Sequence, residues 1–189
     1  MSQLSLSTMK WSLEDWDKLV ESGVLDDKSV ELLDGDIVDM APEGFKHSGS
    51  NRNIADYLRE LFREKALISE THPVRMANSE PQPDIAVVKL PRETYLQRHP
   101  EAVDVYLLIE ISDRTLAKDL GEKAVIYAQN KIPEYWVVDL QHNQVVIHLT
   151  PTDEGYKEVK TVETGTIELV ALDDAVVEVD KLLLYRNLD

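Results

Sequence analysis

Short runs of apolar residues recur from residue 67 onward and predict the strands of a mostly buried β-sheet. They are rich in Val, Ile and Leu, which favour strands when turn residues bound them. In chain order these runs are 67–77, 84–88, 105–111, 135–140 and 144–149. A helical pattern ended by Pro133 fills 116–133, between the third and the fourth run. Because strand, helix and strand in this order form a crossover, we expect a parallel or mixed sheet with a right-handed connection.

The N-terminal part of the chain predicts a short helix and a hairpin. In the segment 11–23, Ser12 is a candidate N-cap with Asp15 three residues later, and Gly23 is a candidate C-cap. Residues 29–42 form two apolar runs around Asp34-Gly35. This dipeptide favours a tight hairpin turn.

A longer helix is predicted at 48–65, and its apolar residues recur on one helical face that should pack on the sheet. These residues are Ile54, Leu58, Leu61 and Phe62. The tail at 155–184 has short strand patterns separated by turn signals and ends in a short helical pattern. Together the elements predict an α/β (α+β) fold, a mixed β-sheet flanked by helices, in a single domain over 1–189. Its core is expected at about 11–149, with a β-rich C-terminal extension at 150–189.

The composition is that of a globular protein without cysteine. The 189 residues are 43% apolar and 30% charged, which suits one domain with a real core. Without thiolates, a metal would take oxygen or histidine ligands, and this favours Mg²⁺ or Mn²⁺. No apolar run is long enough to span a membrane, and the N-terminus lacks the order of a signal peptide. We therefore expect a cytoplasmic protein with no membrane partner.

The charge of the chain is strongly acidic. It has 36 acidic and 20 basic residues, which gives a formal net charge of -16. Such a field repels polyanions at long range. A nucleic-acid partner must overcome this repulsion, and the sequence contains no zinc finger, helix-turn-helix or basic stripe that would read bases.

Four charged residues interrupt the apolar elements and are candidates for chemistry: Glu31, Asp84, Glu110 and Lys123. On a regular helix Lys123 lies about 60° from Leu120 and about 40° from Tyr127, at the border of the stripe that faces the sheet. Carboxylates that hold Mg²⁺, with a lysine that orients water or offsets charge, suffice for phosphodiester hydrolysis.

Each of these residues also has a simpler interpretation. A carboxylate at a strand end is most often a solvated edge residue or a turn cap, and a lysine on a helix edge usually extends its charge into water. Glu110 is harder to explain in this way, because Leu and Ile flank it on both sides. An ionised carboxylate inside a strand must be paired, hydrogen-bonded or bound to a metal.

Four segments together resemble a known family. They are VELLDGDIV, PQPDIAVV, LLIEISDRT and DLGEKAVIYAQNKIPEYWVVDL. Their order, spacing and flanking residues resemble the restriction-endonuclease-like family once catalogued only as a domain of unknown function, within the PD-(D/E)XK nuclease superfamily. The resemblance covers about 11–149 and implies a restriction-endonuclease-like core, in which a mixed sheet is flanked by helices.

The resemblance also implies roles for the four charged residues. Asp84, after Pro83, would supply the first metal carboxylate and Glu110 the second, while Glu31 matches the acidic residue before the core. The superfamily motif would place a lysine two residues after the second carboxylate, where this chain has Ser112. The family pattern moves that lysine to the following helix, where Lys123 matches. The predicted catalytic residues are thus Glu31, Asp84, Glu110 and Lys123. His47 and Asp119 match positions that are often polar, and they receive no role.

The function implied by the resemblance is a Mg²⁺- or Mn²⁺-dependent endodeoxyribonuclease that hydrolyses DNA. A homodimer is expected, because restriction-like enzymes that cut duplexes commonly use two copies. Two alternatives stay open. The fold could serve as a binding or regulatory module without catalysis, which the acidic surface and the displaced lysine favour. The cluster could also support another metal-carboxylate activity, or Lys123 and Glu110 could form a purely structural pair.

Overall fold

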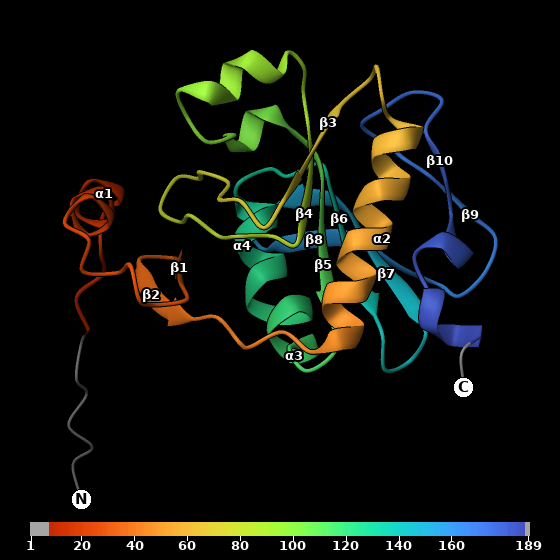
Figure 1. Cartoon of the computed structure of the whole chain (residues 1–189), viewed down its shortest axis with the longest axis horizontal. Coiled ribbons are helices and arrows are strands. Elements are labelled where there is room, and N and C mark those ends of the chain that lie inside the picture. Colours follow the sequence, from red (N-terminus) through yellow and green to blue (C-terminus); the bar gives the residue numbers. More distant parts are fainter. Residues whose placement is uncertain (1–7, 188–189) are drawn as a thin grey trace, which may run out of the picture.

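A six-stranded mixed β-sheet forms the centre of the computed structural model, which describes residues 8–187 (Figure 1). Its strands lie in the order β3-β4-β5-β6-β7-β8. Their bounds are β3 Leu67–Glu70, β4 Ile85–Val88, β5 Val105–Ser112, β6 Glu134–Asp139, β7 Gln144–Thr152 and β8 Gly155–Val162. The pair β5-β6 is parallel and every other neighbouring pair in this sheet is antiparallel. The mixed sheet and the crossover between β5 and β6 are confirmed.

The first predicted strand is shorter than expected. Only Leu67–Glu70 pairs with β4, and Thr71 takes a positive φ of 49° that turns the chain away from the sheet. The rest of the predicted run, up to residue 77, contributes Val74 and Met76 to the core without joining the ladder. An apolar run alone therefore did not distinguish a strand from a packed loop.

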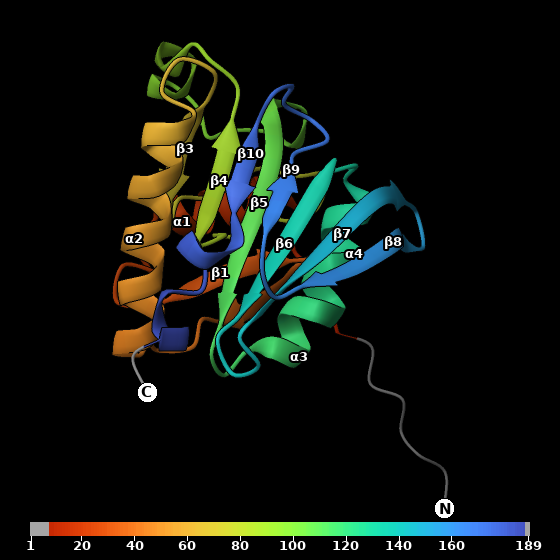
Figure 2. The same cartoon turned by 90° about the vertical axis from the view of Figure 1, so that its right-hand side faces the viewer.

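The long helix α2, Phe45–Leu61, covers one face of the sheet together with the C-terminal segments (Figure 2). Ile54, Leu58 and Phe62 are buried there, as predicted. Leu61 was placed on the same face, but it is 37% exposed because it sits at the last turn, beyond the edge of the packed stripe. Alternate strand residues such as Ile85, Val87 and Ile109 complete this side of the core.

The crossover covers the opposite face, and it is not the continuous α-helix that the sequence predicted. It consists of α3, Leu116–Lys118, a π-helical turn, Asp119–Lys123, and α4, Ala124–Gln129. Leu120 is consequently 37% exposed rather than part of the stripe that faces the sheet. The angles expected for a regular helix do not apply, since a π-turn closes its hydrogen bonds over five residues instead of four.

The N-terminal predictions are confirmed. Helix α1, Leu13–Glu21, begins after Ser12, whose side chain accepts a hydrogen bond from the Asp15 backbone N–H. The hairpin pairs β1, Val30–Leu33, with β2, Asp36–Asp39. Its turn residues Asp34 and Gly35 have φ values of 45° and 76°, the pair of positive angles that a tight type I′ turn requires. A bridge between Leu32 and Glu80 fixes the hairpin beside the segment that leads into β4.

The C-terminal residues add to the same sheet and the same core. β8 pairs with β7, and the small antiparallel pair of β9, Thr166–Glu168, and β10, Val176–Glu178, packs over the α2 side of the sheet. Short 3₁₀ helices complete the structure at Arg92–Leu96, Ala102–Asp104, Val179–Lys181 and Leu184–Asn187. Within residues 8–187, no helix combines the length and the apolar character needed to cross a membrane.

Candidate active site

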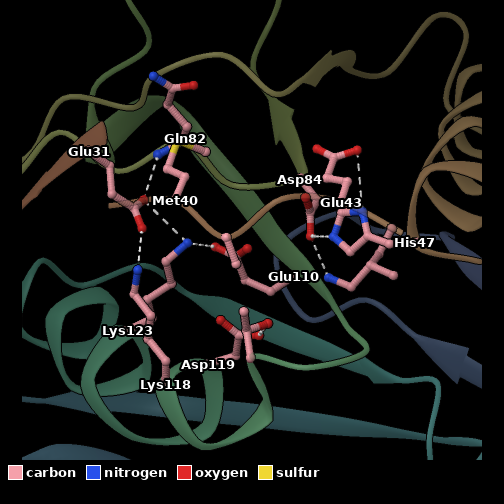
Figure 3. Close-up of a pocket in the computed structure, with 13 residues that line it drawn as sticks. Glu31, Met40, Glu43, His47, Gln82, Asp84, Glu110, Lys118, Asp119 and Lys123 are labelled. Atoms are coloured by element: carbon pink, nitrogen blue, oxygen red, sulfur yellow. Dashed lines mark hydrogen bonds and ion pairs between the residues drawn. The ribbon is translucent and has the colours of Figure 1, made fainter. Parts of the chain in front are cut away.

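A cavity of about 60 Å³ lies where the hairpin, the start of α2, the end of β5 and the crossover meet (Figure 3). All four residues singled out from the sequence line it: Glu31, Asp84, Glu110 and Lys123. The structure therefore brings together side chains that are up to 92 positions apart in the chain. A volume of this size accommodates a few water molecules or a small hydrated cation.

The sheet register places the two strand carboxylates next to each other. Ile85 of β4 pairs with Ile109 of β5 in an antiparallel ladder, so Asp84 and Glu110 occupy the next position of the same ladder. Residues opposite each other in a ladder project to the same face of the sheet. Both residues are nearly inaccessible to solvent, at 8% exposure for Asp84 and 4% for Glu110.

Glu110 has two direct partners on the crossover. Its Oε1 accepts hydrogen bonds from Lys123 Nζ at 2.9 Å and from the Tyr127 hydroxyl at 2.7 Å. Burial raises the pKa of Glu110 to about 8, and the Lys123 ammonium opposes this rise. Burial alone would lower the pKa of Lys123, but the carboxylates of Glu110 and Glu31 outweigh it and hold that pKa above its ordinary value. Lys123 is thus a protonated lysine inside the protein.

Glu31 joins two lysines of the crossover to the hairpin. Its carboxylate contacts Lys118 Nζ at 2.7 Å and Lys123 Nζ at 3.3 Å, and it accepts a hydrogen bond from the Gln82 backbone N–H at 3.2 Å. Burial acts to raise the pKa of Glu31, but the two lysines and the Gln82 N–H outweigh it, so this pKa lies below the ordinary value. Glu31 is therefore an ionised, fully paired carboxylate.

The π-turn explains how Lys118 and Lys123 reach the same carboxylate. On a regular α-helix, five residues advance the chain by about 500°, which would leave these two lysines about 140° apart. In a π-turn, residues five apart lie one turn apart and share a face. The irregular turn Asp119–Lys123 thus directs both ammonium groups toward Glu31.

Asp84 faces a different part of the cavity and contacts α2. Its Oδ2 accepts a hydrogen bond from the Ile111 backbone N–H at 2.6 Å and lies 3.1 Å from His47 Nε2. The other ring nitrogen, Nδ1, is 3.6 Å from Glu43 Oε2. Burial lowers the pKa of His47, but Asp84 and Glu43 outweigh it and raise the pKa to about 8.

The residues around Asp84 fit a divalent cation. Glu43, His47 and Asp84 each present a ligand atom within 4.8 Å of the others. Carboxylate oxygens and imidazole nitrogen are donors that Mg²⁺, Mn²⁺ or other divalent ions accept. Glu110 is not a member of this group of three, because its oxygen is turned toward Lys123 and Tyr127.

Ser112 stands where the superfamily motif has lysine, and its side chain contacts the crossover. Its hydroxyl donates to Asp119 Oδ2 at 2.9 Å, and the Thr115 hydroxyl donates to the same oxygen at 2.6 Å. Burial raises the pKa of Asp119, and these two hydroxyl groups oppose the rise. Both contacts hold the start of the π-turn against the end of β5.

Sequence reasoning missed several residues of this site. Lys118 was overlooked because only a π-turn places it beside Lys123. Tyr127 was assigned to the apolar stripe, although a hydroxyl four residues after a candidate catalytic lysine could have been noticed. His47 was given no role, and Glu43 had no signal in the sequence, since it follows the hairpin in an irregular segment.

The chain was compared with known proteins. A family model described as "Uma2: Putative restriction endonuclease" matches residues 13–180. Among solved structures, a protein from Anabaena variabilis, described as a putative nuclease belonging to DUF820, is similar with a TM-score of 0.66 and 13% sequence identity. That similarity covers 84% of this chain and 92% of the other chain, and at this identity it concerns the fold. No curated protein matches.

These findings agree with the architecture described above, a mixed sheet with helices on both faces. The family model spans nearly the whole chain, from α1 to the last short helices. The chain therefore belongs to the Uma2 family of proteins described as putative restriction endonucleases.

Proposed function

We propose that this protein is a metal-dependent endodeoxyribonuclease that hydrolyses phosphodiester bonds of DNA. The observation that supports it best is the shared cavity of Asp84, Glu110 and a buried, protonated Lys123. The family description points to the same substrate class. Carboxylates and a lysine at adjacent strand ends are the groups that such a hydrolysis requires.

Asp84 and Glu110 are the residues that we assign to a bound Mg²⁺ or Mn²⁺ ion. Glu43 and His47 lie beside Asp84 and offer further donors. When bound, such an ion would polarise the phosphate and make a water molecule more nucleophilic. The donor set is compatible with this assignment because it holds only oxygen and imidazole ligands.

Lys123 is assigned to the transition state rather than to metal coordination. Its ammonium is held between Glu110 and Glu31 and can offset the negative charge that develops on the phosphate. Glu31 positions this group, because it contacts Lys118 and Lys123 together. Glu31, Glu110 and Lys123 are buried, so each of these charge interactions is stronger than it would be at the surface.

The proposal is tested by a plasmid-nicking assay with Mg²⁺ or Mn²⁺ beside metal titration by calorimetry. Asp84→Asn should lose both metal binding and cleavage. Lys123→Met should keep metal binding and lose cleavage by at least about 100-fold, since one electrostatic group of this kind is worth that much. Glu154→Gln, at an exposed position far from the cavity, is the control and should behave as the parent.

Two results would contradict the proposal. Cleavage by Lys123→Met at the parental rate would remove the assigned role of that lysine. A parent that neither binds metal nor cuts any DNA would favour a nuclease fold that acts as a binding or regulatory module. One observation supports that second function: the Lys123 ammonium forms a salt bridge with Glu110 that can neutralise this carboxylate by itself.

A further inference from the structure

A second hollow of the surface lies at the far end of α2 from the candidate active site. It has a volume of about 350 Å³ and is bounded by the end of α2, the edge strand β3 and the segment after β4. Its floor is apolar and includes Leu67, Ile68 and Leu90. Three arginines surround this floor: Arg59, Arg63 and Arg92. We call this feature the arginine groove.

The charge of the arginine groove is opposite to that of the whole chain. No carboxylate belongs to the described residues that line it, although the chain has a formal net charge of -16. Arg59 is paired with Asp56 and Glu70. Arg63 and Arg92 are exposed and form no salt bridge with any residue between 8 and 187. Two guanidinium groups are thus available for an external anion.

We propose that the arginine groove binds the phosphate backbone of the DNA substrate outside the cleavage cavity, an inference that rests on the proposed function. A guanidinium presents a planar fork of donors that matches phosphate oxygens, and it is held less tightly by water than an ammonium. Phosphate contacts of this kind position DNA without reading its sequence. Such contacts would also attract DNA, which the net negative charge of the protein otherwise repels.

Helix α2 sets the distance between the two sites. His47, in its first turn, contacts Asp84 in the cavity, and Arg59 lies twelve residues further along the same helix. At about 1.5 Å per residue this separation is about 18 Å along the helix. Since one strand of a DNA duplex advances about 3.4 Å per nucleotide, both sites can be filled by about five nucleotides or more.

The experiment compares two variants that lose the same charge. Arg63→Gln/Arg92→Gln removes the two free guanidinium groups, and Lys157→Gln/Lys181→Gln removes two exposed charges elsewhere. Binding of a labelled duplex of about two helical turns is measured by fluorescence anisotropy over a series of KCl concentrations, in Mg²⁺ and in EDTA. The groove variant should bind about tenfold more weakly, and its slope of log affinity against log salt should be smaller by about two.

A small phosphodiester separates this inference from the proposed function. Bis(p-nitrophenyl) phosphate is too short to reach the arginine groove, so the groove variant should hydrolyse it at the parental rate. If the parent binds DNA but hydrolyses nothing, the nuclease proposal fails while the binding comparison still tests the groove. If both double variants weaken DNA binding equally, the proposal that the arginine groove binds DNA is wrong, because the loss of positive charge in general would then explain the effect. If the parent protein binds an acidic peptide but no DNA, the proposal is also contradicted.

Discussion

Glu31 shows how this protein tolerates buried charge, because Glu31 and Glu110 both have basic partners on the crossover. Lys118 and Lys123 form salt bridges with Glu31, and Lys123 forms another with Glu110. Burying a charge costs several kcal/mol unless it is paired in this way. Removing one partner therefore lowers the free energy of unfolding by several kcal/mol. A metal ion that takes Glu110 as a ligand must therefore compete with Lys123, so the occupied site should show a rearranged lysine.

A second buried group at the residue scale, His148, contributes to the pH dependence of stability. It stacks on Tyr135 with ring centroids 5.2 Å apart, and burial lowers its pKa. Below the ordinary histidine pKa of about 6.5, His148 binds a proton in the unfolded chain but not in the folded protein. The free energy of unfolding should therefore fall with decreasing pH, by up to about 1.4 kcal/mol per pH unit from this group.

Urea denaturation of the parent and of His148→Phe, between about pH 7 and about pH 5, measures this contribution. The variant should show a flatter dependence, because phenylalanine keeps the stacking and cannot be protonated. His72→Asn, at an exposed position, serves as the control and should keep the parental slope. The same slope in all three proteins would show that His148 is not the responsible group.

At the scale of elements, the π-turn Asp119–Lys123 decides whether the site is assembled. Insertion of one alanine between Gly121 and Glu122 should place Lys118 and Lys123 six residues apart, which is about 120° apart around a regular helix, and so separate the two ammonium groups. One of the carboxylates Glu31 and Glu110 would then lose its partner, at a cost of about 3–5 kcal/mol. Chemical denaturation should show this loss, and cleavage should disappear with it.

Gly121→Ala is the matched control for that insertion, because it adds alanine without changing the spacing of the two lysines. A Cβ at position 121 would meet nothing within 4 Å, and this glycine does not take a positive φ. Alanine favours helices over glycine, so the substitution should raise the free energy of unfolding by about 0.5–1 kcal/mol. An insertion variant as stable and as active as Gly121→Ala would show that the spacing of Lys118 and Lys123 has no role in the site.

Much of the element order could be predicted from the sequence, because local signals decided it. The Ser12 cap and the Asp34-Gly35 turn are read within a few residues, and the strands of the central sheet follow from their apolar runs. The π-turn could not be predicted in this way, since it is accompanied by side-chain contacts of Asp119 with Ser112 and Thr115 that the apolar pattern does not reveal. The contacts of Lys118 and the exposure of Leu120 depend on that turn, so they were missed together.

The four charged residues of the site were predictable for a different reason. Each is polar inside an apolar element, and such an exception to the pattern is visible without knowledge of the fold. Their placement in one cavity follows from sheet register and hairpin docking, which link residues far apart in the chain. Glu43 and His47 lie outside any apolar run, and only the packing of α2 against β4 brings them to Asp84.

At the scale of the whole molecule, the number of copies stays a prediction. We expect a homodimer, because cutting both strands of a duplex is commonly shared between two copies and cyclic pairs are the commonest oligomers. Light scattering should then report twice the 21.5 kDa of one chain. A single species of 21.5 kDa at micromolar concentration would contradict this expectation.

The paired charges of Glu31, Glu110, Lys118 and Lys123 also have a consequence for the history of the family. Among residues 8–187, Glu110 has a salt bridge only with Lys123 and Lys118 only with Glu31, so replacement of Lys123 or Glu31 leaves a charge without its partner. Single substitutions should therefore be selected against, and lineages that exchange Glu31 should exchange Lys118 as well. Family members should therefore conserve these charged residues together, even where the residues of the surrounding surface vary.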